Sequence, residues 1–266
     1  MSAFSELHHG DAPLFLPNAW DHASAVAFAA QGFAAVGTTS LGVAAAVGLP
    51  DGAAATREQT LRLARLLGSE AFLLSVDAED GFSDDPEEVG ELARELHAAG
   101  AAGVNIEDRL GDVALHAAKI SAVKSAAPGL FVNARTDTYW LGEGEGTTRR
   151  LDAYQQAGAD GVFVPGLSEP ATIASLVRAL DVPLNILYSP TGPSVDRLGD
   201  LGVRRVSLGS LPYRRALGAA LEAVADIRAG HPPRGLTPTY QEVQARAGSL
   251  TEAESPRAGR RTRRRE

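Results

Sequence analysis

Short apolar segments alternate with longer amphipathic segments along most of the chain. The short apolar segments are expected to form strands, and there are eight of them, at 14–17, 34–38, 72–77, 103–107, 130–134, 161–164, 184–187 and 205–208. Helices are expected between them, at 22–31, 57–67, 86–99, 115–126, 147–157, 170–180, 194–201 and 212–229. This regular alternation favours a parallel sheet with crossover helices.

The connections from three predicted helices to the strands that follow them share one short sequence pattern. Gly32, Gly100 and Gly158 each follow a predicted helix end and precede the small apolar residues of the next strand. Eight such units predict an α/β fold of the (β/α)8 TIM barrel type. The first strand is not followed by Gly-x-Gly-x-x-Gly, which disfavours an open dinucleotide-binding sheet. We expect one barrel domain with a C-terminal helical extension over 1–247, and a disordered Arg-rich tail over 248–266.

Composition narrows the class of function. The 266 residues include no cysteine, which excludes disulfides, thiolate nucleophiles and cysteine-ligated zinc. The formal net charge is -8 although the last residues are rich in arginine, so the remainder is strongly acidic and is not expected to bind nucleic acid. The first ten residues do not resemble a signal peptide, and no apolar stretch is long enough to span a membrane. We expect a cytoplasmic protein without a membrane partner.

Polar residues cluster where the predicted strands end. Asp77 and Glu79 follow the third strand, Glu107 follows the fourth and Arg135 follows the fifth. In barrel enzymes the C-terminal ends of the strands form the functional face. Carboxylates placed there can hold a hard divalent cation, and an arginine can grip a carboxylate through two hydrogen bonds. The pattern therefore predicts a metal-dependent enzyme that acts on a carboxylate.

Other polar residues have simpler structural interpretations. Isolated carboxylates at strand ends commonly cap helices or lie on the surface, and this interpretation applies to Asp80, Asp108 and Asp137. The histidines lack metal-ligand spacing, and those within predicted helices are expected on the surface. These are His22, His97 and His116.

The ordered motifs resemble the isocitrate lyase and phosphoenolpyruvate mutase superfamily. They are Leu16 to Asp21, Gly32 to Ser40, Asp51, Asp77 to Phe82, Gly103 to Asp108 and Asn133 to Asp137. The resemblance covers about 14–229. It implies an enzyme dependent on Mg²⁺, with Mn²⁺ as an alternative, that forms an enolate from small 2-oxo or 2-hydroxy carboxylates. It also implies a homo-oligomer, a dimer or a tetramer, in which the last helix is often swapped between subunits.

The resemblance assigns roles by position. The residues that match the metal site are Asp77, Glu79 and Glu107. Those that match catalytic positions are Arg135, Glu107 and Asp51, although Asp51 also fits a simple Pro-Asp-Gly turn. The resemblance also assigns substrate contacts to Thr39, Ser40, Leu41 and Arg135, and the strand-end positions of Asn185 and Tyr188 add these two residues to the expected substrate site.

Two of the chain's departures from the superfamily bear directly on the reaction. Members that cleave isocitrate or methylisocitrate use a cysteine in a lid after the fourth strand, so neither activity is expected of a chain without cysteine. The mutases and phosphonopyruvate hydrolases use a longer lid, whereas only Arg109 to Val113 separate Asp108 from the next predicted helix. A short lid leaves the site open to water, which disfavours a metaphosphate-like intermediate.

Three functions are compatible with these features. We expect a Mg²⁺-dependent carbon-carbon lyase or decarboxylase for an oxaloacetate-like 2-oxo or 2-hydroxy di- or tricarboxylate. A retro-aldol lyase would need an acid and a base, for which Tyr139, Tyr188 and Ser189 are candidates. The alternatives are a phosphorus-carbon bond enzyme (phosphoenolpyruvate mutase, carboxyphosphonoenolpyruvate mutase or phosphonopyruvate hydrolase) and a non-catalytic carboxylate-binding relative.

Overall fold

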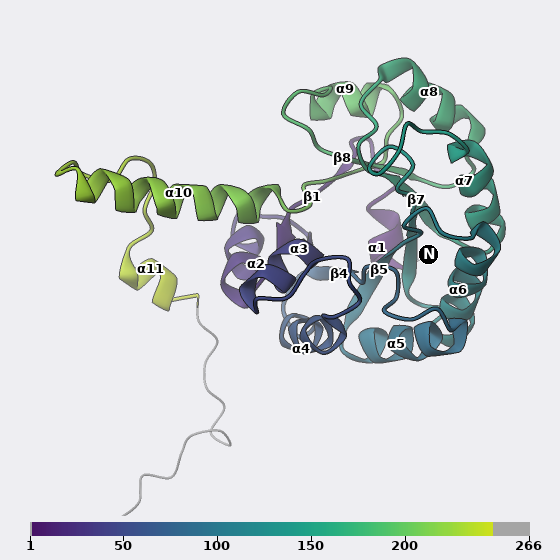
Figure 1. Ribbon diagram of the computed structural model, residues 1–266, viewed down its shortest axis with the longest axis horizontal. Coiled ribbons are helices and arrows are strands. Elements are labelled where there is room, and N and C mark those ends of the chain that lie inside the picture. Colours follow the sequence, from purple (N-terminus) through teal and green to yellow (C-terminus); the bar gives the residue numbers. More distant parts are fainter. Residues whose placement is uncertain (1, 247–266) are drawn as a thin grey trace, which may run out of the picture. The chain divides into compact units, whose positions relative to one another are not determined.

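The computed structural model describes residues 2–246, which contain nine parallel strands surrounded by helices (Figure 1). The strands are β1 (Leu14–Leu16), β2 (Asn18–Ala19), β3 (Ala35–Thr38), β4 (Leu73–Asp77), β5 (Ala101–Glu107), β6 (Phe131–Arg135), β7 (Gly161–Val164), β8 (Leu184–Leu187) and β9 (Arg205–Ser207). From β2 to β9 each strand pairs with the next one along the chain. The predicted (β/α)8 barrel is confirmed.

The first predicted strand closes the barrel and is divided at Pro17. β1 pairs with β9, the last strand of the sheet, whereas β2 pairs with β3. The first predicted strand therefore lies between the last strand and β3. Proline interrupts the ladder because it has no N–H to donate. Its carbonyl still accepts a hydrogen bond from the Gly37 N–H at 2.8 Å. The predicted strand over 14–17 was therefore wrong in two ways. The paired segment extends to Ala19, and it consists of two short strands instead of one.

All eight predicted helices are present, with ends shifted by a few residues. They are α2 (His22–Ala29), α4 (Arg57–Leu67), α5 (Pro86–Ala98), α6 (Val113–Ala126), α7 (Thr147–Gln156), α8 (Pro170–Ala179), α9 (Val195–Asp200) and α10 (Leu211–Arg228). Three short helices were not predicted: α1 (Ala3–Glu6), α3 (Ser40–Ala46) and α11 (Tyr240–Gln244). Amphipathic periodicity is weak in segments this short, so the sequence pattern does not reveal them.

The N-terminal segment seals the end of the barrel opposite the predicted site. Phe4 of α1 is buried and meets Phe131 edge to face, with 5.5 Å between ring centroids. Gly103 makes room for this plug, because a Cβ there would lie 2.6 Å from the Phe4 ring. The His8 ring stacks on Phe131, and its Nδ1 donates to the Phe4 carbonyl at 2.9 Å. Burial, aided by the charge of Arg205, lowers the pKa of His8 to about 3.

The described chain divides into two compact units, one ending at Gly235 and one beginning at Leu236. In the first unit, α10 has no buried residue and extends away from the barrel (Figure 1). In the second, a capping box of Thr239 and Glu242 starts α11. The predicted domain boundary at 247 stays a prediction, and the predicted tail over 248–266 lies outside the described residues.

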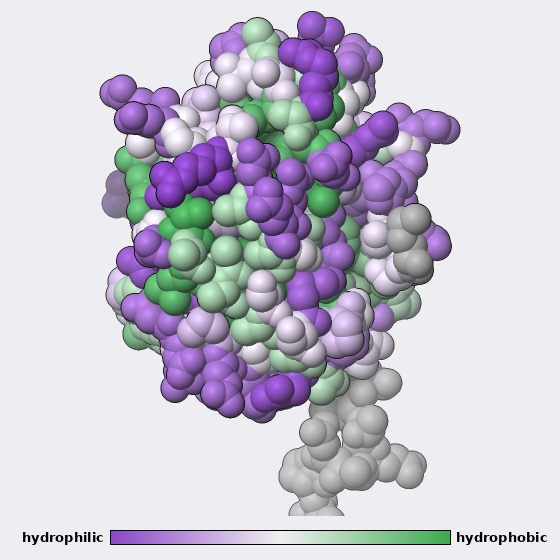
Figure 2. Space-filling view, turned by 90° about the vertical axis from the view of Figure 1, so that its right-hand side faces the viewer, coloured by the Kyte–Doolittle hydropathy of each residue, from purple (hydrophilic) through white to green (hydrophobic). Residues whose placement is uncertain are grey.

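The outer helices present an ordinary mixed surface. Figure 2 views the side at the right of Figure 1, where hydrophilic residues cover much of the face and apolar residues appear between them. Within residues 2–246, no helix has the length and apolar character needed to cross a bilayer.

Candidate active site

A cavity of about 90 Å³ lies at the C-terminal ends of the strands. The predicted site residues that line it are Thr39, Ser40, Leu41, Asp51, Asp77 and Arg135. They come from the ends of β3, β4 and β6 and from the loop before α4. Side chains separated by up to 96 residues in the sequence therefore meet because the strands are parallel and end at one face.

Asp77 is held in place from β3. Its N–H donates to the Thr38 hydroxyl at 2.8 Å, and its carboxylate accepts the Ser40 N–H at 3.1 Å. Burial raises the pKa of Asp77, and the nearby Asp51 adds to this effect, whereas Arg135 and the Ser40 N–H oppose it. The carboxylate is therefore fixed in position, and its burial disfavours the charged form.

Arg135 is the cation of the site. Its guanidinium forms ion pairs with Glu107 at 2.9 Å and Asp137 at 2.7 Å, and it lies 5.8 Å from the Phe163 ring centroid. Burial by itself would lower the pKa of Arg135, but Glu107, Asp137 and Asp77 together raise it. Arg135 is therefore always charged and is pre-positioned against an aromatic face.

Glu107 and Glu79 have different surroundings. Burial, together with Asp77 and Asp137, raises the pKa of Glu107 to about 8 against the opposing effect of Arg135. Glu79 does not line the cavity, because its carboxylate accepts hydrogen bonds from the Thr56 hydroxyl at 2.6 Å and from a backbone N–H at 3.0 Å. Burial raises its pKa, and these two hydrogen bonds oppose the rise. In this arrangement Glu79 anchors the loop that contains Asp51.

These residues fit a divalent cation held largely through water. No three acidic or histidine side chains within residues 2–246 converge to enclose an ion by themselves. Mg²⁺ retains several waters and typically needs only one or two protein carboxylates. Burial, and to a lesser degree neighbouring carboxylates, raises the pKa of Asp77 and Glu107, and a bound cation would favour their charged forms. Asp77 lines the cavity, whereas Glu107 lines a second pocket with Asp80 and Asp108 and pairs with Arg135 at 2.9 Å. These two carboxylates are the residues that would hold the ion.

The segment predicted as a substrate-binding loop is the start of α3. Thr39 precedes the helix and makes no side-chain capping bond, so its hydroxyl is available to the cavity. The first N–H groups of a helix have no partner within the helix, and that of Ser40 is used by Asp77. The N–H of Leu41 is therefore the backbone donor best placed for a carboxylate.

The remaining substrate candidates do not line the cavity. Asn185 is buried beneath it, where its side chain exchanges hydrogen bonds with the Ser207 hydroxyl at 3.0 and 3.2 Å. Tyr188 packs against the core, and neither it nor the proposed acid-base candidates Tyr139 and Ser189 is among the lining residues. Their predicted roles stay predictions without geometric support.

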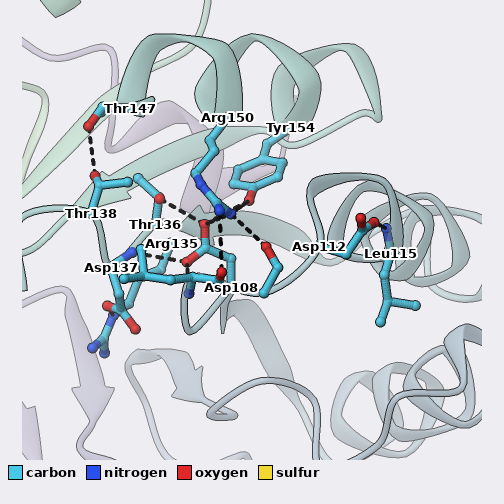
Figure 3. Close-up of polar contacts among 12 residues, drawn as sticks. Asp108, Asp112, Leu115, Arg135, Thr136, Asp137, Thr138, Thr147, Arg150 and Tyr154 are labelled. Atoms are coloured by element: carbon cyan, nitrogen blue, oxygen red, sulfur yellow. Dashed lines mark hydrogen bonds and ion pairs between the residues drawn. The ribbon is translucent and has the colours of Figure 1, made fainter. Parts of the chain in front are cut away.

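Asp108 has a structural role, but it is a buried group and neither the helix cap nor the surface residue that its strand-end position suggested (Figure 3). Its fully buried carboxylate accepts the Tyr154 and Thr136 hydroxyls, both at 2.7 Å, and pairs with Arg150 at 3.0 Å. Burial alone would raise the pKa of Asp108, but the hydrogen bonds, including one from the Asp137 N–H, lower it. This network attaches the short lid to β6, the strand that ends in Arg135.

The surface position predicted for His116 is wrong. Its ring is buried and meets the Tyr154 ring edge to face, with centroids 4.5 Å apart. Burial lowers its pKa to about 4. His116 lies on the inner side of α6 because the helix packs against α7, which contributes Tyr154.

Two aromatic residues that line the cavity were not predicted from the sequence. Trp140 lies on the loop after β6, and Phe163 lies in β7. A lone tryptophan before the glycine-rich stretch 142–146 was the available signal, since loop aromatics often contact ligands. Phe163 gave no signal, because an apolar residue in a buried strand is normally part of the core.

The model of the phosphoenolpyruvate phosphomutase family matches residues 4–228. The chain belongs to this family. Its predicted membership of the isocitrate lyase and phosphoenolpyruvate mutase superfamily is thereby confirmed, as is the prediction of an enzyme of the lyase type. Members of the superfamily are typically metal-dependent.

Similar proteins cover nearly the whole barrel. An uncharacterized protein of Mycobacterium tuberculosis is 46% identical over 92% of this chain and 95% of its own length. An oxaloacetate decarboxylase of a Bradyrhizobium species is 31% identical over 72% of each chain. The crystal structure of a putative phosphonomutase from Burkholderia cenocepacia has a TM-score of 0.79 and is 36% identical, covering 84% of this chain and 97% of its own.

Proposed function

We propose that the chain is a Mg²⁺-dependent decarboxylase or carbon-carbon lyase for a small oxaloacetate-like 2-oxo or 2-hydroxy acid. One observation supports decarboxylation in particular. Within the described residues, the titratable side chains that line the cavity are Asp51, Asp77 and Arg135, with no histidine, lysine or tyrosine. Loss of CO₂ from a 3-carboxy-2-oxo acid needs an electron sink, whereas a retro-aldol step needs both a base for the hydroxyl and an acid for the departing enolate.

The proposed reaction is the decarboxylation of a 3-carboxy-2-oxo acid. The bond between C3 and the leaving carboxylate breaks, its electron pair forms the enolate, and CO₂ departs. Arg135 stabilises the charge that develops on the C2 oxygen, and the Leu41 N–H and Thr39 hydroxyl orient the C1 carboxylate. A divalent cation, when bound, adds Lewis-acid stabilisation of the same charge. Water delivers the proton to C3, which a short lid permits.

A phosphorus-carbon bond activity is the second candidate, because the 36% identical structure is a putative phosphonomutase. The short lid disfavours this activity, because it leaves the site open to water that would intercept a metaphosphate-like intermediate. The two reactions are separated by phosphorus NMR with phosphonopyruvate, since only a mutase or hydrolase would change the phosphorus signal.

The test is a substrate panel with Mg²⁺. We expect the wild-type protein to release CO₂ from oxaloacetate or a related 2-oxo acid. Asp77→Ala and Arg135→Ala should lower kcat/KM by about 10²- to 10³-fold, as removal of a charge-stabilising group typically does. Asp196→Ala and Arg149→Ala alter exposed residues outside the cavity and should leave turnover unchanged. Tight oxalate binding without turnover of any substrate would contradict the proposal and favour the non-catalytic alternative.

We further propose that the protein forms a homo-oligomer through α10, consistent with the helix exchange implied by the superfamily resemblance. The helix exposes apolar side chains that are 50 to 66% accessible: Leu217, Leu221, Val224 and Ile227. An apolar stripe of this kind on a helix without buried residues is typical of an interface.

A further inference from the structure

The cavity has chemically different halves. The acidic residues come from β4 and from the loop before α4, whereas the β6 to β8 region contributes apolar side chains. These are Trp140, Phe163, Pro165 and Leu187, called the apolar wall below. Uncharged polar residues line the rest, among them Asn18, Asn105, Ser207 and Ser210. Because β7 and β8 follow β6 in the sheet order, the wall continues from the position of Arg135 around the barrel.

The backbone fixes Trp140 at the cavity. Its N–H donates to the Asp137 carbonyl at 2.9 Å, which turns the chain directly after Arg135. Gly166 permits this placement, because its φ is +83° and a Cβ there would lie 2.4 Å from the Tyr139 carbonyl oxygen. Trp140 nevertheless remains 56% exposed. A large aromatic surface is therefore held open to the cavity by a constrained backbone.

The charge distribution indicates what the apolar wall can accept. Within residues 2–246, Arg135 is the cation that lines the cavity, and its guanidinium is already paired with Glu107 and Asp137. A second anionic group held against the wall would lose hydration without gaining a cation. An apolar group would instead cover Trp140 and gain the free energy of burying both surfaces.

We propose that Trp140, together with Phe163 and Leu187, determines specificity by binding an alkyl substituent at C3 of a 2-oxo acid. This inference rests on the proposed function for the carboxylate and oxo groups. The cavity of about 90 Å³ must also hold the carboxylate and oxo groups, so the substituent must be small.

The test measures binding of 2-oxo acids that need no turnover. Isothermal titration calorimetry with MgCl₂ compares pyruvate, 2-oxobutanoate and 2-oxopentanoate. In the wild-type protein each added methylene should lower Kd by about fourfold, the effect of burying one CH₂ group. Trp140→Ala should reduce this gain to less than twofold.

Two further variants give matched comparisons. Leu141→Ala removes a neighbouring side chain that is 59% exposed but does not line the cavity, so the chain-length gain should be unchanged. Trp140→Phe retains an aromatic surface and should retain part of the gain. Circular dichroism melts of each variant establish that it is folded before binding is measured.

The outcomes separate this inference from the proposed function. Equal affinities across the series in the wild-type protein, or a gain that survives in Trp140→Ala, would overturn the role of the wall. A gain that depends on Trp140 without turnover of any substrate would support the wall and contradict the decarboxylase. Turnover of oxaloacetate without any gain in affinity along the series would support the decarboxylase and contradict the role of the wall.

Discussion

Replacement of Asp108 by alanine should destabilise the fold strongly, although the residue does not contact the cavity. The carboxylate is fully buried and accepts from the Tyr154 and Thr136 hydroxyls while pairing with Arg150 (Figure 3). It also accepts backbone N–H groups, from Leu110 at 3.0 Å and from Asp137 at 3.1 Å. Truncation would remove the acceptor from all of these donors at once.

The magnitude follows from the donors left behind. Removing one partner of a buried ion pair typically costs about 3 to 5 kcal/mol, because the other charge loses its compensation. Each buried hydroxyl left without an acceptor would cost about 1 kcal/mol or more by itself, but contributions within one network are not additive. We therefore expect Asp108→Ala to lower the free energy of unfolding by about 3 to 5 kcal/mol.

Urea unfolding measures this effect as a lower midpoint with an unchanged slope. Asp112→Ala is the matched control, because Asp112 lies on the same loop but only caps α6 through the Leu115 N–H at 2.8 Å. Loss of one such cap costs about 1 kcal/mol. The reasoning is refuted if Asp108→Ala destabilises the protein no more than Asp112→Ala does.

Two further predictions concern the plug and α10. In the folded state the pKa of His8 is lowered to about 3 from an ordinary 6.5, so the unfolded chain binds more protons between these values and stability falls as pH decreases below 6.5. The free energy of unfolding should therefore fall by about 2 kcal/mol more between pH 7 and pH 5 in the wild-type protein than in His8→Phe; equal losses in urea titrations would refute this assignment. Light scattering should show a dimer or tetramer that Leu221→Glu converts to monomers and that the exposed Glu222→Lys does not, whereas a monomeric wild-type protein would contradict the interface.

The sequence was sufficient to identify the barrel and the polar end of the site. Asp77, Glu107 and Arg135 follow buried apolar segments, and parallel strands bring the residues after them to one face whatever the details of packing. The division of the first strand at Pro17 was harder to see, because it depends on which neighbour each half pairs with.

Periodicity could not distinguish the roles of residues with similar sequence positions. Asp108 and Glu107 are adjacent, yet one bonds to Tyr154 and the other pairs with Arg135. His116 lies in a helix whose polar and apolar positions do not separate clearly by sequence, and its burial results from packing against α7. Strand-end position alone does not specify where a side chain points.

The sequence by itself determined the fold class, the acidic strand ends, the arginine among them, and the absence of cysteine chemistry. Each depends on residue type and local order, which the chain contains directly. Only the tertiary structure decided that Glu79 anchors a loop, that Asp108 holds the lid, and that Trp140 lines the cavity at the strand ends. These roles depend on contacts between residues distant in sequence, and such contacts exist only once the barrel has closed.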